Sequence, residues 1–455
     1  MNCCVATELR PHCNLVFLSS DMVRKVLLIL AALLMASSVW VWVQDITIAH
    51  QEADSRQRGI PRGNLSDLYP RWLGARELLL HGRDPYAADI TREIQTGYYG
   101  RPLDPTRPSD PKDQQAFAYP LYVVLVLAPA VRLPFPLAQR VFLGLLLVLT
   151  AASVLLWLRA LQWRVSITAK LLWIILVVGS FPAIQGFKLQ QLTLLVAALL
   201  AAAMACLVQR RFVIAGILLA IASIKPQLLA LVAIWMIIWI SGNWRDRRKV
   251  FWGAAACMAV LLAGSEFLLP GWIGEFRAAM SSYYKYTGGG RSILDVAMLP
   301  PLGRLASAAL VLVLILLLWK LRREQEGTRA FHWSIAAVIS TTLIIVPMFA
   351  PYNQVLLVPC AMLTLKELPA LWNAGRLARF FALITAVSLA WPFVSAAALA
   401  LAWLFLPAPT VQQGWPVPMA TTLMIPVSLL GLVLVGRKAI CSTYSAPSEP
   451  AIVST

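Results

Sequence analysis

The sequence has little charge, few acidic residues and few cysteines, and each shortage excludes a class of protein. Of its 455 residues, 13% are charged and 59% are hydrophobic, and the mean hydropathy is +0.72. Soluble domains carry about 25% charged residues, so a water-soluble globular protein is excluded, and the apolar fraction excludes a disordered one. Seven cysteines, none of them within residues 45–118, exclude a disulfide scaffold.

Motifs for nucleotides and metals are also missing. The chain has no P-loop, no glycine-rich nucleotide fingerprint and no Asp-X-Asp pair, which argues against chemistry on nucleotide sugars. We therefore expect neither a cofactor nor a metal ion.

The formal net charge is +18, and its distribution decides its meaning. Residues 45–118 hold 10 basic and 11 acidic residues, whereas the rest of the chain holds 29 basic and 10 acidic ones. This excess falls in short connections such as 245–249 and 320–323, as the positive-inside rule describes for cytoplasmic loops. No basic stripe with interleaved aromatic residues occurs, so we expect no nucleic-acid partner. The polar segment 45–118 is then expected outside.

Apolar runs are abundant, and a transmembrane helix needs about 20 residues to cross a bilayer. The runs therefore predict an all-α polytopic membrane protein of about twelve transmembrane helices. We expect it in the plasma (inner) membrane. Residues 1–25 are expected to form a cytoplasmic N-terminus, 26–440 the membrane domain with an uncleaved first span, and 441–455 a disordered cytoplasmic tail. Lys225-Pro226 interrupts one run, which is either one broken helix or two short ones, so the parity stays open. The runs lie near 26–44, 118–133, 137–158, 168–187, 190–209, 212–241, 251–269, 303–319, 331–349, 352–365, 380–405 and 419–436.

The polar segment 45–118 has a pattern of its own. Between residues 68 and 79, apolar side chains recur on one helical face. Ser66 or Asp67 can cap the start of that helix, and Gly82 can close its end. We predict an amphipathic juxtamembrane helix whose stripe lies in the membrane interface. The stripe consists of Leu68, Trp72, Ala75 and Leu79. Asp67 is either an ordinary helix cap or a base held just above the membrane, where lipid-borne substrates present their head groups.

Short motifs follow one another in an ordered series along the chain. In order, spacing and the long first outer segment, this series resembles glycosyltransferase family 87 over about residues 30–436. The sequence departs from the family pattern at Leu189 and Thr193, where glycine and asparagine are common, and at Asn353 and Gln354, where histidine is common. An amide can donate hydrogen bonds to phosphate or sugar, but it cannot titrate. The motifs are Ser66-Asp67 with Tyr69, Gly82-Arg-Asp-Pro-Tyr86, Phe117-Ala-Tyr-Pro120, Lys188-Leu-Gln-Gln191-Leu-Thr-Leu-Leu195, Ile224-Lys225-Pro226 and Pro347-Met-Phe-Ala-Pro-Tyr-Asn-Gln354.

The resemblance implies a GT-C-type helix bundle and transfer of a hexose, mannose or another, from a polyprenyl-phosphate-linked sugar donor. The acceptor would be a lipid or a glycan of the cell envelope, outside the lipid bilayer. Asp67 matches the acidic residue of the family's first outer loop, the proposed general base, which takes the proton of the attacking hydroxyl. The leaving phosphate needs fixed positive charge or hydrogen-bond donors, and the single displacement inverts the sugar.

The remaining candidates bind donor or acceptor, each with a structural alternative. Lys225 interrupts an apolar run either to bind the donor phosphate or to reach an interface with its charged end. Tyr283 and Tyr286, in a second polar connection, either stack on a sugar or, as the default interpretation, anchor the chain at the membrane interface. The other candidates either contact the substrates or serve as helix caps and lipid contacts: Lys188, Gln190, Gln191, Arg71, Tyr69, Tyr119, Asn353 and Gln354.

Two other functions remain open. A transporter or flippase of a lipid-linked sugar would handle the same molecules, but transporters have short loops and intramembrane charged pairs. A polymerase or ligase of surface polysaccharide carries its large outer loop later in the chain. The long early segment therefore favours the glycosyltransferase, and the sequence predicts no particular oligomeric state.

Overall fold

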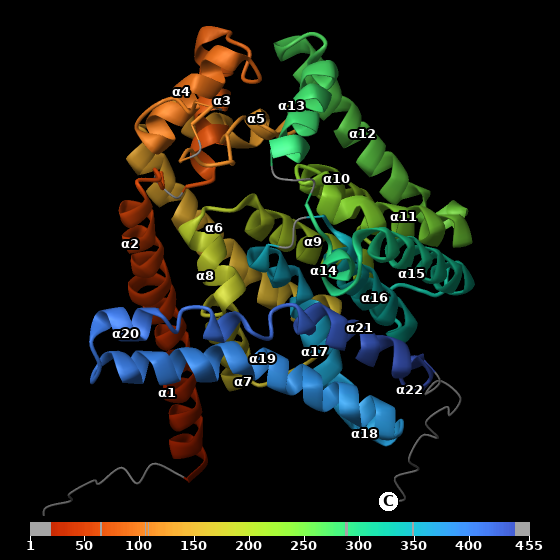
Figure 1. Cartoon of the computed structure of the whole chain (residues 1–455). Helices are drawn as coiled ribbons and strands as arrows, with labels where there is room; N and C mark the ends of the chain where they lie inside the picture. The colour runs from red at the N-terminus through yellow and green to blue at the C-terminus, as the bar shows by residue number, and fades with distance from the viewer. Residues whose placement is uncertain are drawn as a thin grey trace, which may run out of the picture.

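The computed structural model describes residues 20–63, 66–104, 106–107, 109–286, 290–347 and 350–441, and every regular element in them is a helix (Figure 1). The predicted tail after Cys441 and most of the predicted cytoplasmic N-terminus lie outside these residues. The elements are α1 (Ser20–Val41), η1 (Trp42–Ile48), α2 (Ala49–Arg58), α3 (Leu68–His81), α4 (Ala88–Tyr99), α5 (Val123–Leu127), η2 (Ala128–Ala130), α6 (Phe135–Ala160), α7 (Ile167–Val178), α8 (Phe181–Lys188), α9 (Leu192–Val208), α10 (Phe212–Ala222), α11 (Pro226–Gly242), α12 (Trp244–Leu268), α13 (Trp272–Tyr286), α14 (Ile293–Ala297), α15 (Pro300–Lys320), α16 (Arg329–Ile345), η3 (Pro351–Leu357), α17 (Val358–Lys366), α18 (Leu368–Asn373), α19 (Arg376–Trp403), α20 (Ala408–Gln412), η4 (Val417–Met419), α21 (Met424–Val435) and α22 (Arg437–Cys441).

Among the described residues, six helices are long and apolar enough to cross a membrane, and the pair α7 and α8, bent by 53°, makes up to seven. Shorter apolar helices accompany them: α9, α10, α11 and α16. An all-helical, multi-pass architecture is therefore confirmed, whereas the number of about twelve spans stays a prediction. The six are Asp21–Arg58, Phe135–Ala160, Trp244–Leu268, Pro300–Lys320, Arg376–Trp403 and Ala408–Val435.

The first helix runs far beyond the predicted end of its span at residue 44. α1, η1 and α2 continue as one helix from Asp21 to Arg58, and Gly59 ends it in the left-handed conformation with φ 67°. The predicted start of a loop at Asp45 is therefore wrong. No proline or glycine occurs between residues 45 and 58, and once a helix exists each further residue adds a hydrogen bond at little cost.

α3 confirms the predicted helix, including its end at Gly82, but not the predicted environment of its stripe. Leu68 is 2% exposed and Ala75 is 0% exposed, and both belong to the main core together with the chain that returns from the polar segment. Gly74 makes room for that chain, since a Cβ there would lie 2.5 Å from the ring of Phe117. The stripe therefore packs against protein, and its placement in the membrane interface is wrong.

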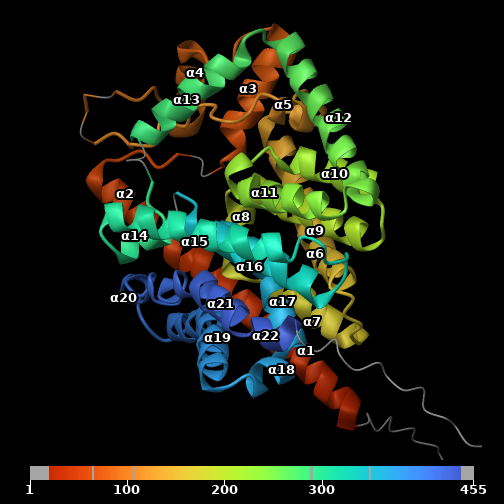
Figure 2. The ribbon, with the colours of Figure 1, turned by 90° about the vertical axis from the view of Figure 1, so that its right-hand side faces the viewer.

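α4 was not predicted. A turn begins at Asp84, where the Ala87 amide donates to the Asp84 carbonyl at 3.2 Å, and it leads directly into α4. Ile90 and Ile94 are fully buried and join the core that contains α3. α3, α4 and α13 all lie at the upper end of the molecule (Figures 1 and 2).

The structure decides between the two alternatives for the run 212–241. This run forms two short helices, α10 and α11, separated at Lys225, because a proline disfavours the helical conformation of the residue before it. The run 118–133 contains only α5 and η2, of five and three residues, which are too short to cross a bilayer.

α10 and α12 approach each other backbone to backbone. A Cβ on Gly216 would lie 2.1 Å from the carbonyl oxygen of Val250, and one on Gly253 would lie 2.4 Å from that of Val213. Small residues at such contacts allow helices to associate in lipid, where burial alone provides little driving force.

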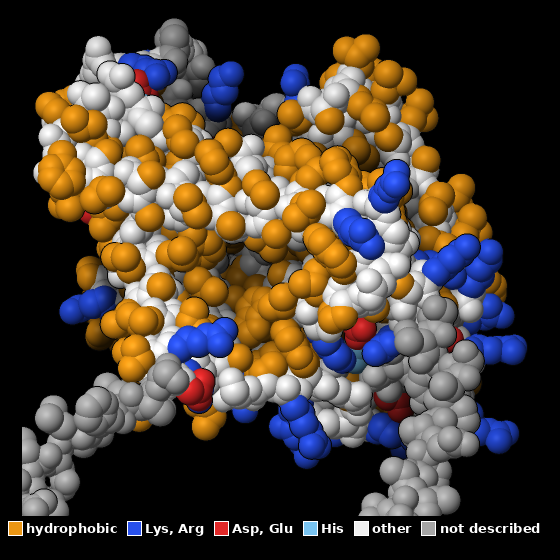
Figure 3. Space-filling model, turned by 90° about the horizontal axis from the view of Figure 1, so that it is seen from below, with side chains coloured by type: hydrophobic (Ala, Val, Ile, Leu, Met, Phe, Trp, Pro, Cys, Tyr) orange, Lys and Arg blue, Asp and Glu red, His pale blue; other side chains and the backbone are white. Residues whose placement is uncertain are grey.

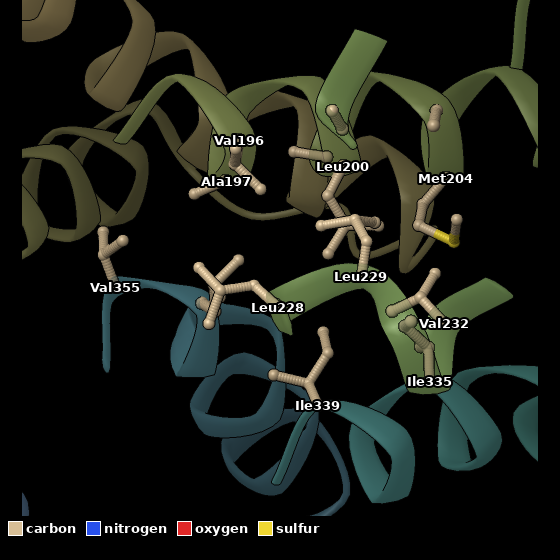
Figure 4. Close-up of a cluster of buried hydrophobic side chains, with 14 of the residues drawn as sticks. Val196, Ala197, Leu200, Met204, Leu228, Leu229, Val232, Ile335, Ile339 and Val355 are labelled. Carbon is tan, nitrogen blue, oxygen red and sulfur yellow. The ribbon is translucent and has the colours of Figure 1, made fainter. Parts of the chain in front are cut away.

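The middle of the core lies where α9, α11 and α16 meet (Figure 4). Because lipid tails are as apolar as these side chains, close contact rather than removal from water holds the helices together in a bilayer. α9 and α11 begin at the same end of this core, and this end carries the candidate site. The side chains labelled in Figure 4 are Val196, Ala197, Leu200, Met204, Leu228, Leu229, Val232, Ile335, Ile339 and Val355.

Candidate active site

A cavity of about 150 Å³ lies where α3, α13 and the beginnings of α9 and α11 meet. Residues from six separate parts of the sequence line it, so the fold rather than any local motif assembles the site. Its polar and aromatic lining residues are Asp67, Arg71, Asp113, Gln115, Tyr119, Gln191, Lys225, Gln227, Phe276, Tyr283, Tyr286 and Tyr352.

Asp67 stands directly before α3 but does not cap it. Its side chain accepts no hydrogen bond from the helix amides, and Gln191 Nε2 instead donates to its carboxylate oxygen Oδ2. The Asp67 amide donates to the carbonyl of Leu189 at 2.9 Å, which ties α3 to the connection between α8 and α9. The capping interpretation of Asp67 therefore fails, and its carboxylate faces the cavity.

Lys225 is the second ionisable group of the site. It is 4% exposed, and its Nζ donates to Gln191 Oε1 at 2.6 Å and to Thr193 Oγ1 at 2.7 Å. Nζ also lies 5.1 Å from the ring centroid of Tyr352. The side chain thus turns inward and does not extend to an interface, so the interfacial interpretation of Lys225 is wrong. Gln191 links its ammonium to the carboxylate of Asp67.

Arg71 supplies a second cation, one helical turn beyond Asp67. One guanidinium nitrogen donates to the carbonyl oxygen of Asp67 and another donates to Tyr119 Oη at 2.7 Å. The guanidinium carbon lies 4.2 Å from the Tyr119 ring centroid, a cation–π contact. Within the described part of the chain, the buried Nε of Arg71 has no hydrogen-bond partner.

The surroundings of Asp67 make its carboxylate a stronger base than an exposed one. Burial raises its pKa, and the positive charges of Arg71 and Lys225 offset only part of this increase. A base with a raised pKa accepts protons more readily near neutral pH. The same two cations favour an anionic ligand beside it.

Three predicted binding residues lie outside the cavity lining. Gln190 Oε1 accepts from Ser66 Oγ at 2.5 Å, so it positions the residue before Asp67. Lys188 donates to Gln44, and its Nζ lies 3.9 Å from a tryptophan ring centroid of α1. Tyr69 packs edge-on against an aromatic ring of α6 with centroids 4.8 Å apart.

Asn353 and Gln354 also lie behind the lining. Thr193 Oγ1 donates to Asn353 Oδ1 at 2.9 Å, so this amide supports the hydroxyl that Lys225 contacts. Gln354 donates to the carbonyl of Thr422 at 2.5 Å. Tyr352, next to them in the sequence, is the residue of this motif that reaches the cavity.

The lining also contains residues that the sequence interpretation missed or assigned to the membrane interface. Asp113 and Gln115 come from the irregular part of the polar segment, and Tyr283 and Tyr286 from α13. The sequence Asp113-Gln-Gln115 follows a proline-rich stretch and has no periodic signal, so only the fold identifies the first two. The two tyrosines are three residues apart on a helix, which predicts a shared face.

One comparison with known proteins identifies a family. A family model described as glycosyltransferase family 87 matches residues 117–347, just over half of the chain. Among curated proteins and among solved structures, none matches significantly. The matched region contains Gln191 and Lys225, whereas Asp67 and Arg71 precede it. Within the described residues, no group of three or more His, Cys, Asp or Glu side chains is arranged to hold a metal ion.

Proposed function

Because the chain belongs to glycosyltransferase family 87, we propose that this membrane enzyme transfers a hexose, such as mannose, from a polyprenyl phosphate to an acceptor hydroxyl. The observation that carries the proposal is the position of Asp67: its carboxylate lines the cavity, accepts a hydrogen bond from Gln191 and interacts with the positive charges of Arg71 and Lys225. This arrangement provides a base and an anion site within one cavity.

The proposed reaction is a single displacement. The acceptor oxygen attacks the anomeric carbon while Asp67 takes the hydroxyl proton, and the bond between that carbon and the phosphate oxygen breaks. The polyprenyl phosphate leaves with the electron pair, and Lys225 and Arg71 stabilise its growing negative charge. The attacking and leaving groups lie on opposite sides of the sugar, so the configuration inverts.

The distribution of basic residues supports an active site on the outer side of the membrane. Arg210 Nε pairs with Glu326 at 3.0 Å, and Arg247 donates to the carbonyls of Arg322 and Glu324 at 2.7 and 2.6 Å. The connections after α9, α11 and α15 therefore meet at one end, whereas α9 and α11 begin at the cavity. Lys and Arg side chains stand around the rim of the lower face (Figure 3). By the positive-inside rule this end is cytoplasmic.

Twelve crossings fit this orientation. We count α1, α6, the α7–α8 pair, α9, α10, α11, α12, α15, α16, η3 with α17, α19 and α21. Dividing the run 212–241 adds one crossing, and the short α5 removes one, so the total stays even. With this division Arg210 and Arg211 lie on the same side as residues 245–249, which the positive-inside rule favours.

The test is transfer of labelled mannose from polyprenyl-phosphate-mannose by the full-length protein in detergent, with membrane glycolipid and glycan extracts as acceptors. Asp67→Asn is expected to lower kcat by about 10²- to 10⁴-fold, the usual contribution of a general base. Asp89→Asn is the matched control, because Asp89 is an exposed carboxylate of the same segment that pairs with Arg83 at 2.8 Å.

Two outcomes would refute the proposal. Full activity of a folded Asp67→Asn variant would refute the role of Asp67 as the base. Wild-type protein that transfers no mannose would refute the proposed transfer reaction. If the protein in vesicles moves the intact lipid-linked sugar across the bilayer and yields no transfer product, its function is that of a transporter rather than a glycosyltransferase.

A further inference from the structure

The proposed phosphate contacts involve only part of the cavity lining, namely Arg71, Lys225 and Gln191. The other half of the polar lining includes a second carboxylate, Asp113, from the irregular part of the polar segment, and the rings of Tyr283 and Tyr286 from α13. A second carboxylate disfavours a second anion, so a neutral ligand fits these residues better.

Asp113 is held in a fixed conformation. Its carboxylate accepts hydrogen bonds from the amide of Gln115 at 3.1 Å and from Gln115 Nε2 at 2.9 Å. Its carbonyl accepts from Tyr99 Oη at 2.8 Å, and the neighbouring Gln114 carbonyl accepts from Gln95 Nε2 at 3.0 Å. α4 therefore anchors this loop, and the side chains of Asp113 and Gln115 reach the cavity as one unit.

α13 provides aromatic surface to the same half. The rings of Tyr283 and Tyr286 meet edge to face, with centroids 5.3 Å apart. Burial raises the pKa of Tyr283 to about 12, so this phenol stays neutral at physiological pH. The ligand therefore faces one carboxylate, one amide and two neutral aromatic rings.

This chemistry fits a sugar ring. A carboxylate accepts hydrogen bonds from two neighbouring hydroxyls, and an amide both donates and accepts. Aromatic rings with a polar edge cover the apolar C–H face of a pyranose while their hydroxyls reach a partner. A neutral, polyhydroxylated ligand can contact both the hydrogen-bonding groups and the aromatic rings, whereas a phosphate or a lipid tail cannot contact both.

We propose that Asp113, Gln115, Tyr283 and Tyr286 bind a saccharide acceptor and turn one of its hydroxyls toward Asp67. This inference rests on the proposed glycosyl transfer and names its acceptor as a sugar rather than the head group of a simple lipid. Asp113 is a binding residue that determines acceptor specificity, and Asp67 remains the base.

Direct binding tests the subsite independently of catalysis. Methyl glycosides of mannose, glucose and galactose are titrated into the full-length protein in detergent, and saturation-transfer NMR reports binding. At least one glycoside is expected to bind the wild type. Asp113→Asn is expected to weaken binding by about tenfold or more, because it removes hydrogen bonds to a charged group. Tyr286→Ala is expected to weaken binding because it removes aromatic surface from the sugar. Tyr286→Phe keeps the ring and is expected to bind better than Tyr286→Ala.

Tyr284→Ala is the matched control, because Tyr284 lies on the same helix, is 52% exposed and does not line the cavity. It is expected to bind as the wild type does. No binding of any glycoside by the wild type, or equal binding by all variants, would overturn the inference. In transfer assays, Asp113→Asn should raise the acceptor KM and leave the donor KM unchanged. Intact glycoside binding without any transfer would refute the proposed function alone.

Discussion

Replacing Lys225 by methionine tests the proposed phosphate site most directly. Methionine retains an unbranched apolar chain in a position that is 4% exposed, so the volume is nearly preserved while the charge is lost. If Lys225 stabilises the leaving phosphate, the change removes one charge-assisted hydrogen bond, which contributes about 1.5–3 kcal/mol. At about 1.4 kcal/mol per factor of ten, kcat/KM for the donor should fall by about 10- to 150-fold.

The assay separates phosphate binding from general damage. Free polyprenyl phosphate, the product, should inhibit the wild type, and its inhibition constant should rise in Lys225→Met by a similar factor. Lys225→Arg keeps the charge and should restore part of the loss. Lys188→Met is the control, because Lys188 donates to Gln44 and lies outside the cavity lining.

Unfolding temperatures complete the comparison, since Lys225 also donates to Gln191 and Thr193. Loss of these two bonds should lower the unfolding temperature of Lys225→Met slightly. The reasoning is refuted if a folded Lys225→Met protein keeps the wild-type kcat/KM, or if product inhibition is unchanged while kcat/KM falls.

Two further predictions concern electrostatics and helix contact. The charge of Arg71 lowers the pKa of Asp67, so Arg71→Met should move the acidic limb of the kcat/KM profile to higher pH by about 1 pH unit. Arg76→Met is the control and should not move this limb, because Arg76 lies on the same helix but donates to a main-chain carbonyl. An acidic limb that stays in place in Arg71→Met would contradict the assignment of Asp67 as the base. Gly216→Ala places a Cβ 2.1 Å from a main-chain oxygen of α12 and should lower the free energy of unfolding by about 1–3 kcal/mol, measured as a lower unfolding temperature in detergent. Gly144→Ala is the control and should not lower this temperature, because its Cβ meets open space. Equal unfolding temperatures for the two variants would show that the contact between α10 and α12 adapts freely.

The sequence predicts helices wherever composition and periodicity act alone. The apolar runs correspond to helices of the structure, and the stripe of α3 and its end at Gly82 follow from local spacing. What it misses depends on neighbours in space. The extension of the first helix to Arg58 is polar and has no apolar period, and the stripe around Leu68 is covered by a chain segment about 50 residues later.

In the candidate site, too, the sequence predicts some residues, and others are identified only by their neighbours in space. Asp67, Arg71 and Lys225 stand out from the sequence because each is a charged residue beside or within an apolar pattern, and all three line the cavity. Gln190 and Gln191 are neighbours with equal claims in the sequence. The structure separates them, because Gln191 bonds Asp67 whereas Gln190 turns to Ser66 with a left-handed φ of 45°.

One structural rule connects these residues. Asp67, Gln191 and Lys225 each stand directly before a helix, α3, α9 and α11, and none of the three side chains caps its own helix. They bond one another instead, with Gln191 in the middle. The beginnings of α9 and α11 therefore bring the positive ends of two helix dipoles to the cavity. Such ends favour an anion, which adds to the charges of Lys225 and Arg71. A phosphate leaving group would thus be stabilised by the fold itself, while the carboxylate of Asp67, free of any capping role, is available to take the proton.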